Sequence, residues 1–192
     1  YYVSGALVSH KHVVAPANSV SYWNEATKKY VIRGLSSVKI YLGALQESIS
    51  RQVFDPVKFV NHPQLRKVDE SRVNDIAVIT LDRRVEFDEF IRPVCLWTFS
   101  DDLSIANSPI YAVGYGRDET GELSKIKKHA KVALEDQEKC EESFSNVVQV
   151  TKTICIKGNK AGAPCANDYH IFVKFNDKWF LRGTQLRFFC LF

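Results

Sequence analysis

The chain has 192 residues, of which 45% are apolar and 25% are charged, and its formal net charge is +4. This composition excludes a wholly disordered chain, and the length suits one large domain or two small subdomains that share a core. Nucleic-acid binding is not expected, because the charge is small and the basic run at residues 125–128 is short. A solvated basic face is expected at that run, with a weak anionic partner such as a polysaccharide as the alternative. No apolar run approaches the length of a membrane span.

The sequence does not begin at a start codon. The chain contains no methionine, and it starts directly in strand-like residues. We therefore expect a processed chain, a domain excerpt or an incomplete sequence, with any signal peptide before residue 1.

The cysteines predict disulfides rather than a metal or redox motif. There are five of them, and none belongs to a Cys-x-x-Cys pair. Their spacing suits two short disulfide loops, Cys140–Cys155 and Cys165–Cys190, with Cys95 left over. Each loop would stabilise the fold by about 3 kcal/mol if loop entropy alone acts. Because disulfides persist in oxidising compartments, a secreted, extracellular protein is predicted.

Short strands separated by turns dominate the pattern in chain order. Strands are predicted at residues 6–8, 12–15, 38–42, 57–60, 76–81, 110–113 and 130–134, and an extended segment at 92–97. A helix is predicted at residues 135–144, and a hairpin at 172–182 with Asn176 and Asp177 as its two-residue turn. The pattern indicates an all-β barrel or sandwich, and periodicity alone does not choose between the two.

Several motifs occur in the order known from one protein family. The run Gly-Ala-Leu-Val-Ser-His-Lys-His-Val-Val-Ala-Pro-Ala-Asn-Ser-Val at residues 5–20 resembles the segment that carries the catalytic histidine of chymotrypsin-like serine proteases. The run Asn-Asp-Ile-Ala-Val-Ile-Thr-Leu at residues 74–81 resembles the segment that carries their catalytic aspartate. Further matches follow at residues 92–96, 113–117, 136–140, 154–158, 165–170 and 179–183. The sequence therefore resembles this trypsin-like family over nearly its whole length.

The resemblance implies a particular all-β fold. Members of the family fold as two antiparallel β-barrels, with the active site in the cleft between them. Residues 1–97 would form the N-terminal barrel, residues 98–108 a linker and residues 109–192 the C-terminal barrel. Both ends would be incomplete relative to the family.

The resemblance also implies that the catalytic triad is degenerate. Its histidine, aspartate and serine positions correspond to Asn18, Asp75 and Tyr169. An asparagine amide cannot act as a general base, and a tyrosine hydroxyl, with an ordinary pKa of about 10, stays protonated at neutral pH. The bulky ring of Tyr169 would either occupy the substrate site or turn away from it. Asp75, the one match, is expected to be a hydrogen-bonded structural carboxylate at the barrel junction.

The positions around the triad depart from the family as well. Asn167 replaces the glycine of the oxyanion hole, and His170 and Ile171 replace the glycines after the serine. Ala163 stands where trypsin-like members have the aspartate that binds basic side chains, and Asp168 lacks the family's N-terminal Ile-Val-Gly-Gly as a partner. Neither oxyanion stabilisation nor trypsin-like specificity is expected.

Two framework features concern disulfides. Ser19 and Val3 occupy both positions of a family disulfide, so its two halves are absent together. Cys95 lies where many members join the catalytic domain to an upstream segment or chain. An interchain or upstream disulfide of Cys95 and a free thiol both remain open.

Three interpretations follow. The first is a secreted, proteolytically inactive serine protease homologue that binds or regulates a protein partner, such as a protease, an inhibitor or another component of an extracellular cascade, in immunity or in host interaction. The second is an atypical hydrolase in which Tyr169 acts with His170, or with His10 and His12. The third is a degenerate chain without a folded role. No cofactor is predicted, and no metal site, because His10 and His12 lack a third ligand in the sequence.

Overall fold

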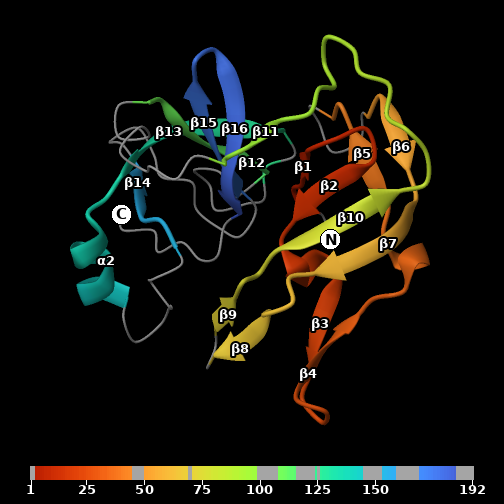
Figure 1. Ribbon diagram of the computed structural model, residues 1–192, viewed down its shortest axis with the longest axis horizontal. Helices are drawn as coiled ribbons and strands as arrows, with labels where there is room; N and C mark the ends of the chain where they lie inside the picture. Colours follow the sequence, from red (N-terminus) through yellow and green to blue (C-terminus); the bar gives the residue numbers. More distant parts are fainter. Residues whose placement is uncertain are drawn as a thin grey trace.

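The protein is described by a computed structural model that covers residues 3–44, 50–68, 71–98, 108–115, 124, 126–144, 153–158 and 169–184. These residues are mostly β-strand, with few helices (Figure 1). The predicted β character is thus correct for the described part of the chain.

The N-terminal half is built on one antiparallel sheet with the strand order β1-β2-β10-β7. Its strands are β1 (Ala6–Leu7), β2 (His12–Ala15), β10 (Ala77–Leu81) and β7 (Pro56–Asn61). Three two-stranded ribbons accompany it: β3 (Ser21–Asn24) with β4 (Lys29–Ile32), β5 (Ile40–Leu42) with β6 (Gln52–Phe54), and β8 (Arg66–Val68) with β9 (Ser71–Val73). Two short 3-10 turns, η1 (Ala17–Ser19) and η2 (Leu35–Ser37), complete this half.

Strand β10 is buried on one face and half-buried on the other, in keeping with its continuous apolar sequence. Ala77, Ile79 and Leu81 face the main apolar cluster of the N-terminal half. Val78 points the other way and packs against a second cluster that also contains residues of the C-terminal half. The strand that follows Asp75 is therefore fixed from both sides.

The C-terminal half is a sheet with the order β11-β16-β15-β12-β13-β14. Its strands are β11 (Cys95–Leu96), β16 (Lys178–Thr184), β15 (Tyr169–Phe175), β12 (Ile110–Gly114), β13 (Lys128–Leu134) and β14 (Ile156–Gly158). Helix α2 (Gln137–Phe144) carries Cys140, which forms a disulfide with Cys155 across a Cα–Cα distance of 6.3 Å.

The predicted hairpin between β15 and β16 has the turn that its sequence favours. Asn176 and Asp177 have φ angles of 47° and 56°, and Phe175 pairs with Lys178 across the turn. Two consecutive positive φ angles define a type I′ turn, whose twist matches that of the strands.

The two halves meet along an apolar seam. Ala6 and Val14 of the first sheet pack with Leu181 of β16, and Phe172 of β15 packs against the same cluster. Strand β11 runs parallel to β16, while the Val94 N–H just before it donates to the Leu7 carbonyl at 2.9 Å. Residues 94–96 thus join the two halves at one edge of the seam.

Two expectations about the architecture remain open. Within the described residues neither sheet closes into a barrel. Most of the predicted linker 98–108 lies outside these residues, so the limits of the two halves stay a prediction. None of the described helices is long and apolar enough to cross a membrane.

Candidate functional site

The site is built around Asp75, which lies in a tight turn immediately before β10. Asn74 adopts a left-handed φ of 58°, which asparagine tolerates better than most residues, and its side-chain amide donates to the Gln64 carbonyl at 3.0 Å. The Ile76 N–H then donates to the Asn74 carbonyl at 2.8 Å and closes the turn. This geometry buries Asp75, which is 5% exposed.

The first oxygen of Asp75 is held by the segment that carries Asn18. Asn18 lies in η1, and its backbone N–H donates to Asp75 Oδ1 at 3.0 Å. Its side-chain oxygen is buried and has no hydrogen-bond partner among the described residues. The residue in the histidine position therefore contacts the carboxylate through its backbone.

The second oxygen of Asp75 is occupied by Arg72. Arg72 Nε, from β9, donates to Asp75 Oδ2 at 2.8 Å in an ion pair whose carboxylate side chain is 3% exposed. A buried carboxylate that lacked a cation would be costly, so this pair neutralises the charge that the fold buries. An imidazole that approached Asp75 would have to share an oxygen that already accepts a hydrogen bond.

The backbone of Asp75 also contacts the C-terminal half. The Thr184 hydroxyl, at the end of β16, donates to the Asp75 carbonyl at 3.3 Å. Asp75 therefore lies at the junction of the two halves, as the sequence predicts.

Tyr169 lies in the core of the C-terminal half. It begins β15, is 4% exposed and packs with Ile171, Val173 and other apolar residues of the sheet. The ring of Tyr169 is therefore turned into the core, away from the substrate site, which is the second of the two placements expected from the sequence. A hydroxyl buried in this way is poorly placed to attack a substrate.

His170 points to the opposite face of β15, because neighbouring residues in a strand alternate. It is 2% exposed, and its ring hydrogen-bonds the backbone of Ser4 in the N-terminal half. Its Nδ1 is buried without a hydrogen-bond partner among the described residues. Burial lowers the pKa of this ring, although the Ser4 contact opposes the shift. A neutral histidine is thus inserted between the halves.

The other histidines considered as bases lie at the far end of the sheet. His12 pairs with Thr80, whereas Ala77, nearer to Asp75, pairs with Ala15. The His10 ring stacks on Phe87 and hydrogen-bonds the Val85 carbonyl at 2.9 Å. No group of three metal-ligating side chains occurs in the part of the chain that the structure describes.

The structure describes only some of the remaining predicted residues. Asn167, Asp168, Ala163, Cys165 and Cys190 lie outside the described residues. Cys95 is a free, exposed cysteine in β11, and its expected partner stays a prediction. Ser19, at the lost disulfide position, donates its hydroxyl to the Pro16 carbonyl at 2.6 Å.

Comparison with known proteins identifies the family. The family model described as trypsin matches residues 2–169, a stretch that contains Asn18 and Asp75 and ends on Tyr169. The chain belongs to the trypsin family.

Several curated insect proteins are similar to this trypsin-family chain. Phenoloxidase-activating factor 1 of Holotrichia diomphalia is 27% identical over 199 residues, covering 93% of the chain and 52% of that protein. The CLIP domain-containing serine protease HP8 of Bombyx mori is 25% identical over 207 residues, covering 90% and 53%. Melanization protease 1 of Drosophila melanogaster is 24% identical over 187 residues, covering 88% and 45%. The chain thus spans about half the length of these relatives.

Arg72 is the functional residue that the sequence interpretation missed. It lies three residues before Asp75, and this spacing is the feature of the sequence that could have indicated a contact between the two side chains. Spacing alone did not indicate a contact, because an (i, i+3) pair meets only where the backbone turns back, as it does at Asn74.

We expect Arg72→Ala to lower the free energy of unfolding by about 1–3 kcal/mol, because the buried Asp75 oxygen loses its charged donor. The matched control is Arg84→Ala, which removes an exposed arginine. Thermal or urea unfolding of both variants measures the difference. Equal effects of the two substitutions would show that the Arg72–Asp75 pair contributes nothing.

We expect His170 to make the protein less stable in mild acid. Burial holds the pKa of His170 below its ordinary value of 6.5, so the unfolded chain binds a proton that the folded chain resists. Stability is therefore fully present above about pH 6.5 and falls as the pH drops below it. Urea unfolding at about pH 7.5 and pH 5.5 should show a smaller difference in His170→Gln than in the wild type or in His129→Gln, an exposed control. A His170→Gln variant with the wild-type pH dependence would contradict this assignment.

Proposed function

We propose that this trypsin-family chain is proteolytically inactive and acts by binding or regulation. The observation that carries the proposal is the state of Asp75. Its oxygens are bonded to the Asn18 backbone and to Arg72, so the carboxylate that orients the histidine in active enzymes has a structural role here.

The other two triad positions support the same proposal. Asn18 supplies no base, and Tyr169 supplies no accessible nucleophile because its side chain is in the core. We further propose that the two halves are the barrels of the trypsin fold, divided at residues 98–108, and that the degenerate residues Asn167 and Ala163 leave no oxyanion hole or trypsin-like specificity pocket.

The atypical hydrolase is the alternative. It needs Tyr169 to act with His170, or with His10 and His12. Tyr169 and His170 face opposite sides of β15, and His12 lies at the end of the β2–β10 pair remote from Asp75. These placements favour the binding protein over the enzyme.

The setting and the partner follow from the disulfide and the relatives. The Cys140–Cys155 disulfide favours an oxidising compartment, and we propose that the protein is secreted. Two relatives are named for phenoloxidase activation and melanization. We therefore propose a protein partner in a protease cascade of that kind: a protease, an inhibitor or another cascade component.

A fluorophosphonate probe, which labels activated serine nucleophiles, tests the inactivity. The wild type should show no labelling and no peptidase turnover, whereas an active trypsin under the same conditions should label stoichiometrically. Stoichiometric labelling of the wild type, at residue 169 or elsewhere, would overturn the proposal.

The double variant Asn18→His/Tyr169→Ser tests the role assigned to Asp75. It should also remain unlabelled, because Arg72 still occupies Asp75 Oδ2 and the side chain of residue 169 faces the core. Labelling of this variant, with none in the wild type, would leave the proposed inactivity intact but refute the claim that Arg72 blocks the site.

A further inference from the structure

A surface groove of about 620 Å³ lies in the N-terminal half, outside the degenerate triad. One wall is the β3–β4 ribbon, and the other is formed by the end of β7, the turn after it and β8. Its lining residues are Trp23, Lys28, Lys29, Tyr30, Ile32, Phe59, Val60, Asn61, His62, Pro63, Leu65, Arg66 and Lys67. The groove thus brings together two segments that are distant in the sequence.

All the permanent charges that line the groove are positive. Lys28 and Lys29 come from the β3–β4 ribbon, and Arg66 and Lys67 come from β8. No aspartate or glutamate is among the lining residues. Four cations in one groove attract an anion, and the field is strongest where the walls exclude water.

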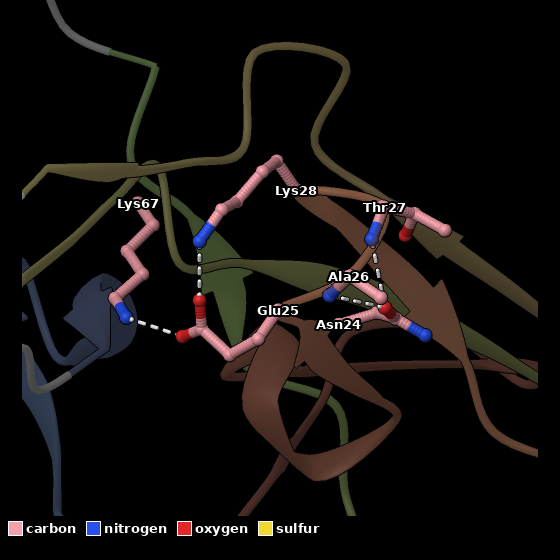
Figure 2. Close-up of polar contacts among 6 residues, drawn as sticks. All are labelled: Asn24, Glu25, Ala26, Thr27, Lys28 and Lys67. Carbon is pink, nitrogen blue, oxygen red and sulfur yellow. Dashed lines mark hydrogen bonds and ion pairs between the residues drawn. The ribbon is translucent and has the colours of Figure 1, made fainter.

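Glu25, in the turn between β3 and β4, holds two of these lysines in place (Figure 2). Its Oε2 accepts from Lys28 Nζ at 2.8 Å, and its Oε1 accepts from Lys67 Nζ at 2.9 Å. These two contacts lower the pKa of Glu25 to about 2, so the carboxylate is charged at neutral pH. One carboxylate shared by two lysines leaves the groove with an excess of positive charge.

The turn that carries Glu25 is itself well defined. The Asn24 side-chain oxygen accepts from the Ala26 and Thr27 N–H groups, each at 3.0 Å, as Figure 2 shows. Lys28 then adopts a left-handed φ of 51° and returns the chain into β4. The lysines of this wall are therefore presented by an ordered turn.

Aromatic rings lie beside the cations. Trp23 and Tyr30 pack edge to face with their centroids 5.1 Å apart, and Lys67 Nζ is 5.8 Å from the centre of the Trp23 ring. Exposed apolar surface continues along the groove at Ile32 and Val60. Apolar surface between two basic walls suits a ligand with an apolar face and anionic groups at its edges.

We propose that this groove binds a sulfated polysaccharide. The sugar rings would pack on the aromatic and aliphatic surface, and the sulfates at their edges would contact Lys28, Lys29, Arg66 and Lys67. Three of the four cations are lysines, which bind anions as point charges and so accept a tetrahedral sulfate as readily as a planar carboxylate. The aromatic and aliphatic lining between the basic walls favours a sulfated sugar chain over an acidic peptide, because a sugar ring offers a flat C–H face to the Trp23 and Tyr30 rings. This proposal does not depend on whether the chain is proteolytically active.

The test measures binding of a heparin-derived oligosaccharide to the disulfide-bonded protein by calorimetry at low and at physiological salt. The groove variant Lys29→Gln/Lys67→Gln should bind about tenfold more weakly, if each exposed contact contributes an ordinary ion-pair energy. The control Lys131→Gln/Lys178→Gln removes the same charge from exposed positions of β13 and β16 and should bind nearly as the wild type does. Binding of the wild type should also weaken as salt screens the charges.

A third variant is expected to bind the oligosaccharide more tightly instead of more weakly. Glu25→Gln removes the carboxylate that competes for Lys28 and Lys67, so the oligosaccharide should bind about two- to threefold more tightly at low salt. A thermal melt confirms that each variant is folded. Tighter binding in Glu25→Gln is not expected from a nonspecific loss of structure.

Each other outcome overturns the proposal. Absence of wild-type binding at low salt excludes the site, and equal weakening by the groove and control variants shows a response to net charge alone. Equal binding of the desulfated oligosaccharide excludes sulfate recognition. If polyglutamate binds the groove more tightly than the sulfated probe does, the ligand is an acidic peptide instead.

Discussion

The buried carboxylate of Asp75 is the constraint on which the arrangement at the junction of the two halves depends. A charge that is 5% exposed must be compensated where it lies. The chain supplies a backbone N–H from η1 and a guanidinium from β9, and it fixes the backbone of the same residue through the Thr184 hydroxyl. Three separate segments therefore converge on one residue, and two of them contact its carboxylate.

The positions of Tyr169 and His170 follow from the alternation of side chains between the two faces of β15. One side chain joins the core of the C-terminal sheet, and the other enters the seam against Ser4. An active member of the family needs its serine exposed to the cleft, whereas both side chains are buried here. Tyr169 contributes to the core of one half and His170 to the contact between the halves, which agrees with the proposed inactivity.

Much of the fold could be predicted from the sequence, because local patterns fix it. The apolar run of β10 and the Asn176–Asp177 turn occur where they were predicted. The β3–β4 and β8–β9 ribbons were not predicted, since their strands are short and mix polar with apolar residues, so that they carry little periodicity. For the site, motif order placed Asp75 at the junction. The Arg72 contact and the inward turn of Tyr169 required tertiary geometry, and so did the meeting of Lys28 and Lys29 with Arg66 and Lys67.

The β8–β9 ribbon connects the basic groove with the surroundings of Asp75. Lys67 and Arg72 lie directly opposite each other in its register, so two like charges share one face of a short two-stranded element. Their repulsion is offset by acids from outside the ribbon, Glu25 for Lys67 and Asp75 for Arg72. The groove and the surroundings of Asp75 are therefore electrostatically linked through a shared ribbon, so an anion that draws Lys67 outward would relieve the repulsion on Arg72.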